Sequence, residues 1–94
     1  MLQPKLTKVE PMQPYFLRLH YTSGEVKVFD VLPYIVGSWY GELADKEYFM
    51  TVQLLPEGSG IKWPNGQDIA PHELYDNSVK VLYKREKAAI VSTV

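Results

Sequence analysis

The sequence predicts an α+β fold, a small single domain of antiparallel strands and hairpins with two or three short helices. Its seven Pro and six Gly are spread along the 94 residues between short segments, which limits each helix or strand to a few residues. Several of these segments alternate apolar and polar residues, the pattern of a strand with one buried face. With 46% apolar residues, a chain of this length can form one modest core, and no second domain is expected.

Three strands are predicted in the first third of the chain. Leu6–Glu10 forms the first strand, which Pro11 ends. The second strand is Tyr15–Tyr21, and the third is Glu25–Phe29. In the second strand the apolar side chains alternate onto one face: Tyr15, Leu17, Leu19 and Tyr21.

The turn between the second and third strands decides which side chains share that face. A two-residue loop at Ser23-Gly24 sets Tyr21 opposite Val26 and Leu19 opposite Val28, which extends the apolar face onto the third strand. A register shifted by one residue would instead place Glu25 and Lys27 against the apolar face. The two-residue loop is therefore the predicted connection.

Short helical segments are expected at three places. Val31–Ile35 is too apolar for a solvated loop, and its proline can start a helix or 3₁₀ turn that ends at Gly37. Asp45 is the expected N-cap of a helix of one to two turns, in which Phe49 packs inward. Pro71–Tyr75 predicts a further single turn.

A strand is also predicted at Thr51–Leu55, where Pro56 stops it. The segment Glu57–Gly60 contains two glycines and is expected to be flexible. A further strand begins at Ile61.

The residues from Ile61 to Ile69 predict a hairpin. A two-residue loop at Asn65 and Gly66 would mix apolar and charged residues on both faces. A three-residue loop at Pro64–Gly66, with a type I turn and a left-handed glycine, sets Ile61 opposite Ile69 and Lys62 opposite Asp68. This register is preferred, and it gives a structural role to five residues: Trp63, Pro64, Asn65, Gly66 and Asp68.

From about Leu6 to Val79 the sequence resembles an uncharacterised bacterial family, catalogued as domain of unknown function 2442. The residues that carry the resemblance are Gly24-Glu25, Phe29-Asp30, Pro33-Tyr34, Ile61, Trp63-Pro64-Asn65-Gly66, Asp68-Ile69, Pro71 and Leu74-Tyr75. The resemblance implies an α+β fold and no known reaction. It also implies that some relatives are encoded beside another small protein in what look like toxin–antitoxin pairs, and that some continue into a helix-turn-helix domain.

This resemblance divides the chain into a family-like domain, residues 1–79, and a basic C-terminal extension, residues 80–94. The extension is too short for a helix-turn-helix, so DNA binding by that route is not expected. Whether the extension forms a strand, forms a helix or is disordered is left open by its sequence.

No catalytic, cofactor or metal site is predicted. The chain has no Cys, and its two imidazoles, His20 and His72, lack the spacing of a zinc site. Asp30 and Asp68 would form a carboxylate pair only if the fold brought them together. Capping of the following turn explains Asp30 as well, and pairing with Lys62 across the hairpin explains Asp68. Enzyme activity is therefore not expected.

The candidate partner-binding residues are Tyr34, Trp39 and Tyr40. They lie near Gly37 and Gly41, in a segment with more aromatic side chains than so small a core can bury, and exposed aromatics often anchor partners. If the segment is extended, the adjacent Trp39 and Tyr40 point to opposite faces, so burial of one exposes the other.

The predicted function is a non-catalytic interaction or regulatory module, such as the antitoxin-like half of a two-gene bacterial pair, with another protein as its partner. The alternative is a nucleic-acid-associated accessory protein that uses the basic patch Lys80, Lys84, Arg85 and Lys87, although the net charge of −1 gives no general attraction to nucleic acid. A small enzyme of unknown class is the third hypothesis. No membrane span or secretory signal is expected, and a cytoplasmic location is predicted.

Overall fold

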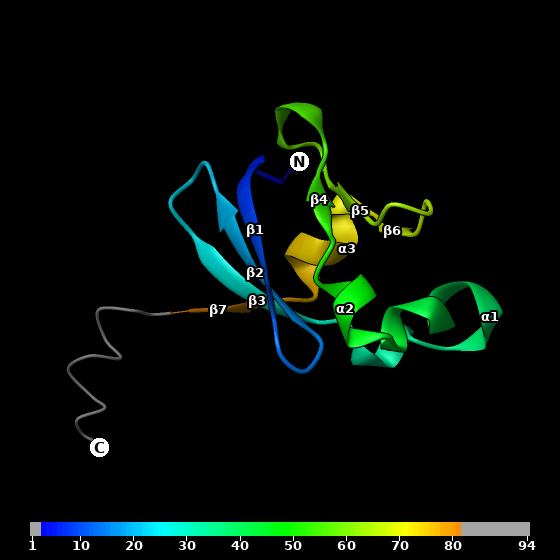
Figure 1. Ribbon diagram of the computed structural model, residues 1–94. Helices are drawn as coiled ribbons and strands as arrows, with labels where there is room; N and C mark the ends of the chain where they lie inside the picture. The colour runs from blue at the N-terminus through cyan, green and yellow to red at the C-terminus, as the bar shows by residue number, and fades with distance from the viewer. Residues whose placement is uncertain (1–2, 82–94) are drawn as a thin grey trace, which may run out of the picture.

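Two antiparallel sheets form the framework of the molecule. The computed structural model describes residues 3–81. The first sheet has the order β1 (Leu6–Met12), β2 (Phe16–Tyr21), β3 (Val26–Asp30) and β7 (Val79–Lys80) (Figure 1). The second has the order β4 (Gln53–Leu54), β5 (Ile61–Lys62) and β6 (Asp68–Ile69). With the short helices described next, they confirm the α+β fold.

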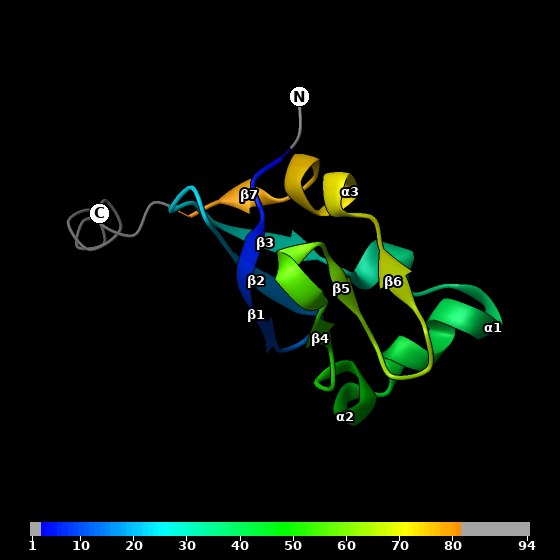
Figure 2. The same cartoon turned by 90° about the horizontal axis from the view of Figure 1, so that it is seen from above.

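Short helices and 3₁₀ turns (η) connect these strands. They are η1 (Leu32–Tyr34), α1 (Gly37–Tyr40), η2 (Gly41–Ala44), α2 (Lys46–Phe49), η3 (Pro56–Gly58) and α3 (Pro71–Asp76). The first four follow β3 and lead from the first sheet to the second. In the views of Figures 1 and 2, α1 lies at the opposite end of the molecule from β7.

The core is enclosed by the two sheets and by the short helices that pack against them (Figure 2). Its fully buried side chains include Leu17, Leu19, Phe29, Val31, Leu43, Phe49, Ile61, Trp63 and Leu74. Trp63 is the largest of them, and its Nε1 donates a hydrogen bond to the Phe49 carbonyl oxygen at 2.8 Å. Because this bond satisfies the single polar atom of the indole, the whole side chain can be buried at little polar cost.

The Trp63-Pro64-Asn65-Gly66 hairpin has the predicted three-residue loop. Ile61 pairs with Ile69 and Lys62 pairs with Asp68. The Trp63 N–H donates to the Gln67 carbonyl oxygen at 2.8 Å, and the Gly66 N–H donates to the Trp63 carbonyl oxygen at 2.9 Å. Gly66 has a φ of 107°, a conformation that glycine adopts without a Cβ penalty. The sequence prediction for this element is confirmed.

The predicted register between β2 and β3 is wrong by one residue. Leu19 lies opposite Lys27, and Tyr21 donates a backbone hydrogen bond to the Glu25 carbonyl oxygen, so the loop has three residues. Glu25 and Lys27 therefore lie on the side of the sheet that faces the core. Tyr75 of α3 hydrogen-bonds both charged side chains: its hydroxyl donates to Glu25 Oε1 at 2.7 Å, and its carbonyl oxygen accepts a bond from Lys27 Nζ.

One expected helix start has its predicted N-cap, and an aspartate also bonds the backbone at the start of a second turn. Asp45 Oδ1 accepts bonds from the backbone N–H groups of Glu47 at 3.0 Å and Tyr48 at 3.3 Å, which confirms it as the N-cap of α2. Asp30 Oδ1 accepts a bond from the Leu32 N–H at 3.0 Å, at the start of η1. Short polar side chains at these positions satisfy N–H groups that a helix leaves unpaired.

Other predicted boundaries need correction. β1 continues through Pro11 to Met12, which an edge strand permits because a proline nitrogen there needs no ladder partner. In the predicted strand Thr51–Leu55, only Gln53–Leu54 forms ladder pairs. The segment expected to be flexible, Glu57–Gly60, contributes to η3, and its Gly58 is buried.

Candidate partner-binding surface

A buried glutamine fixes the aromatic segment onto the hairpin. Gln67 is fully buried, and its Oε1 accepts a hydrogen bond from the Tyr48 hydroxyl at 2.7 Å. Its Nε2 donates to the Trp39 carbonyl oxygen at 3.1 Å and to Glu42 Oε1 at 2.8 Å. One side chain of the hairpin therefore holds α1, η2 and α2 together.

Asn65 adds to this arrangement from the turn of the hairpin. Its Nδ2 donates to Glu42 Oε2 at 2.8 Å, and its backbone N–H donates to the Tyr48 hydroxyl oxygen at 2.8 Å. The bonds from Asn65, and then those from Gln67, lower the pKa of Glu42 from its ordinary value of 4.5, because they stabilise the carboxylate form. The residues of the hairpin motif thus position the neighbouring surface.

The chain from η1 through α1 exposes unusually many apolar side chains. In residues 3–81, three of the six exposed large hydrophobic residues lie here: Leu32 at 55%, Val36 at 67% and Trp39 at 51% exposed. Single exposed apolar residues are ordinary on protein surfaces. Three within eight consecutive positions, on the part of the chain that leads to the end of the molecule in Figure 1, form a candidate contact surface.

Trp39 and Tyr40 lie in a helical turn, so the extended stretch considered in the sequence analysis is not formed. The predicted turn before them ends at Tyr34, and Gly37 begins α1. Trp39 is the exposed member of the pair, whereas Tyr40 is half-buried and packs against the core. A Cβ built on Gly66 would lie 3.6 Å from the indole ring, so the hairpin turn supports one side of Trp39.

Tyr40, which follows Trp39 in the chain, lines a small open pocket of about 280 Å³, here called the tyrosine pocket. Its walls are formed by Tyr34, Tyr40, Asp68, Ile69, Ala70 and Glu73. The Tyr34 hydroxyl donates to Glu73 Oε2 at 2.5 Å, and the Tyr40 hydroxyl donates to the Asp68 carbonyl oxygen at 2.9 Å. Both aromatic rings are therefore held in place without a ligand.

The electrostatic character of the pocket is acidic. Of residues 3–81, the ones that line it include the acidic Asp68 and Glu73 and no Lys, Arg or His. The hydrogen bond to Glu73 raises the pKa of Tyr34, because that bond exists only while the phenol keeps its proton. Lys62 is the cross-strand neighbour of Asp68, yet their side chains form no ion pair within 4.0 Å among the described residues.

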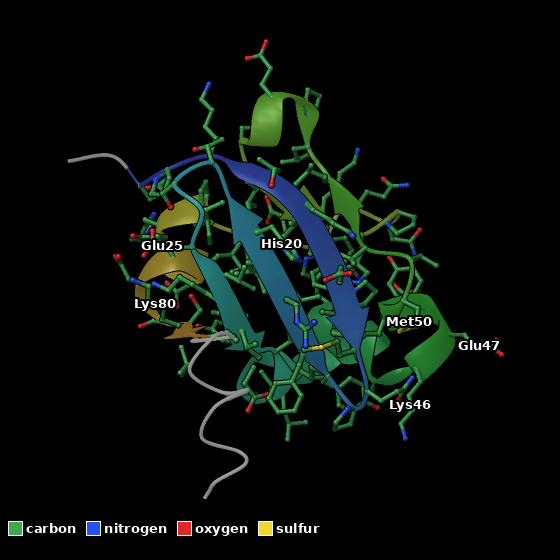
Figure 3. The ribbon with its side chains drawn as sticks, turned by 90° about the vertical axis from the view of Figure 1, so that its left-hand side faces the viewer. His20, Glu25, Lys46, Glu47, Met50 and Lys80 are labelled. Carbon is green, nitrogen blue, oxygen red and sulfur yellow. The ribbon has the colours of Figure 1, made fainter. Side chains whose placement is uncertain are left out.

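The remaining candidate residues lie elsewhere. His20 is on the first sheet (Figure 3), where its Nε2 lies 2.7 Å from Glu10 Oε1. His72 is an exposed residue of α3. Over residues 3–81 no group of three or more His, Cys, Asp or Glu side chains could hold a metal ion.

The predicted basic patch is described at one position alone. Lys80 belongs to β7 and lies 3.8 Å from Glu25 Oε2, at the edge of the first sheet away from α2 (Figure 3). Lys84, Arg85 and Lys87 lie outside the described residues. In the described part of the chain, no helix has the length and apolar character that crossing a membrane requires.

Comparison with known proteins identifies the family. The family described as protein of unknown function (DUF2442) matches residues 6–80, which contain both sheets, the hairpin and the tyrosine pocket. The chain belongs to this family. No curated protein and no solved structure matches it. The DUF2442 match thus confirms the resemblance seen in the sequence and assigns no activity.

Sequence reasoning missed several residues of this DUF2442 surface: Glu42, Tyr48, Gln67 and Glu73. A usable signal existed for Gln67, because opposite residues of an antiparallel pair share a face, and the predicted register set Gln67 opposite the buried Trp63. For Glu73 there was none, because its contact with Tyr34 joins residues 39 positions apart in the sequence.

Proposed function

We propose that this chain is a non-catalytic protein–protein interaction module whose partner contacts Trp39 and the adjacent tyrosine pocket. The observation that carries the proposal is the half-exposed indole of Trp39, which is supported by the hairpin instead of being free in solvent. A large, rigid aromatic side chain loses little conformational entropy on binding, and such residues dominate the binding energy of many interfaces.

Exposed apolar neighbours extend this candidate interface. Leu32 and Val36 offer further apolar area, and burial of such area drives most protein association. The hydrogen bonds from Gln67 and Asn65 hold the segment in one conformation, which lowers the entropy cost of binding. We extend the proposal to a regulatory, antitoxin-like role in the bacterial cytoplasm, which rests on the family resemblance.

The test begins with the partner that co-purifies with the chain from the cells that encode it. Isothermal titration of the purified partner then compares the parent chain with Trp39→Ala. We expect this substitution to weaken binding by about 1 to 3 kcal/mol, or about 5- to 150-fold, with little change in melting temperature. Met50→Ala is the matched control, because Met50 is 43% exposed, follows α2 and is not among the residues that line the pocket.

Other outcomes would redirect the proposal. Equal loss of affinity in both variants, or none in either, contradicts binding through Trp39. His20→Ala and His72→Ala should leave binding unchanged, whereas turnover of a substrate that depends on either histidine would indicate an enzyme. Salt-sensitive binding of DNA or RNA that is lost on replacement of Lys84, Arg85 and Lys87 would support the nucleic-acid role.

A further inference from the structure

The tyrosine pocket has the chemistry of a receptor for one positively charged side chain. We propose that it binds an arginine or lysine side chain of the partner. This inference rests on the proposed function, because the proposed partner is the molecule that carries the side chain. The residues that line the pocket include two acidic ones, Asp68 and Glu73, and two tyrosines, and no Lys, Arg or His among residues 3–81 lines it.

The two carboxyl groups have free acceptor capacity. The exposed carboxyl group of Asp68 has no hydrogen bond or ion pair with other residues of the described chain, and Glu73 uses Oε2 alone, for Tyr34. A carboxylate attracts an ammonium or guanidinium group, and charged hydrogen bonds are stronger than neutral ones. An anionic ligand would meet two like charges here.

The rings of Tyr34 and Tyr40 supply the second feature that a cation requires. An aromatic face attracts a cation placed within about 6 Å of the ring centroid. Because the hydroxyl groups are bonded to Glu73 and to the Asp68 backbone, the rings need no rearrangement before binding. Ile69 and Ala70 add apolar walls suited to the methylene stem of lysine or arginine.

A second tyrosine–glutamate pair in the molecule already has a cation beside it. On the opposite side of α3, the Tyr75 hydroxyl donates to Glu25 Oε1, and Lys27 Nζ lies 3.8 Å from the centroid of the Tyr75 ring. The tyrosine pocket repeats the tyrosine–glutamate pair as Tyr34 and Glu73. Its cation would come from another molecule, since no basic residue of the described chain lines it.

Size and ligand number narrow the class of ligand. Pockets for complete small molecules usually measure about 300 to 1,000 Å³. The tyrosine pocket, at about 280 Å³, lies just below this range, as expected for a single side chain. The described residues contain no group of three or more His, Cys, Asp or Glu side chains that could hold a metal ion.

The test is an NMR titration of the full-length ¹⁵N-labelled chain with capped amino acids. The probes are N-acetyl-arginine methylamide and N-acetyl-lysine methylamide, and the neutral comparison is N-acetyl-citrulline methylamide, which has nearly the shape of the arginine probe. We expect saturable shifts of the amides of Tyr34, Tyr40, Ile69 and Glu73 with the basic probes. The neutral probe should bind at least about fivefold more weakly, because it lacks the charge.

Two variants locate the effect. The double substitution Asp68→Asn, Glu73→Gln keeps the shape and the hydrogen-bond acceptors, and should weaken the arginine probe at least about fivefold. Glu47→Gln, which removes an exposed carboxylate on α2 outside the pocket, should leave its affinity unchanged (Figure 3). Melting temperatures of all variants establish that each is folded.

The inference is overturned if citrulline and arginine probes bind alike, if the shifts map away from the pocket, or if the double variant binds as well as the parent. Larger shifts at the same amides with Mg²⁺ or Ca²⁺ at equal concentration would also overturn it, in favour of a metal site. These outcomes leave the proposed function standing if Trp39→Ala still weakens partner binding. If Trp39→Ala has no effect while the probes bind, the proposed function fails and the pocket chemistry stands.

Discussion

Gly58 is the glycine at which the fold leaves least room for a side chain. Its φ is 67°, and a Cβ built on it would lie 2.0 Å from the Leu6 carbonyl oxygen. This oxygen belongs to the backbone of β1, so it cannot move aside as a flexible side chain would. Gly58→Ala therefore requires a left-handed alanine and also a displacement of η3 from the first sheet.

Two contributions set the size of the effect. A Cβ at positive φ costs roughly 1 to 2 kcal/mol, and a forced shift of packed backbone adds about 1 to 3 kcal/mol. We expect Gly58→Ala to lower the free energy of unfolding by about 3 kcal/mol. Gly66→Ala is the matched control, because Gly66 also has a positive φ, but its added Cβ would meet the Trp39 ring at an ordinary 3.6 Å. The control should lose about 1 kcal/mol.

Urea unfolding followed by circular dichroism measures the free energy of unfolding of both variants under the same conditions. Thermal unfolding gives a second readout: for a domain of this size, a loss of 1 kcal/mol lowers the melting temperature by about 4 to 8 °C, so the melting temperatures of the two variants should differ clearly. Equal losses in Gly58→Ala and Gly66→Ala would show that backbone strain alone matters and that η3 does not pack tightly on β1.

Three further predictions concern stability and ligands. Asp45→Ala should lower the free energy of unfolding by about 1 kcal/mol while Asp45→Asn should be nearly neutral in the same urea assay, because either Asp or Asn can cap α2. The pKa of Glu42 is lowered in the folded chain, so the Glu42 carboxylate contributes stability above about pH 4.5, and this contribution is lost as the pH falls through the folded pKa. Glu42→Gln should therefore reduce the decline in the free energy of unfolding measured between pH 6 and pH 3. EDTA should leave the melting temperature unchanged, and a downward shift would reveal a bound metal.

The sequence predicted best the elements that local chemistry determines. The hairpin at Trp63 was predicted with its loop length and register because each loop residue has its own conformational preference, and Asp45 was identified because capping acts over three residues. Phe49 was correctly placed in the core from its spacing to this cap.

The errors share a cause, which is dependence on contacts distant in sequence. The β2–β3 register places Glu25 and Lys27 toward the core, and this is acceptable because Tyr75, about fifty residues away, compensates them. No local rule contains that information. Pro11 stays within β1 because the strand lies at a sheet edge, which is known only once the topology is known.

The candidate site shows the same division. Tyr34, Trp39 and Tyr40 were selected from their aromatic character, and the structure places two of them in the lining of one pocket and leaves the third half-exposed. The acidic side of that pocket, Glu73, lies on α3 and meets Tyr34 only in the folded chain.

Amide hydrogen exchange of the chain, alone and with its purified partner, tests the central claim most directly. If the partner binds Trp39 and the tyrosine pocket, exchange should slow in residues 32–41 and 68–73, because these amides lose access to solvent or gain stability in the complex. Exchange that slows in β1–β3 alone, with no change at residues 32–41, would contradict the account and place the interface on the first sheet.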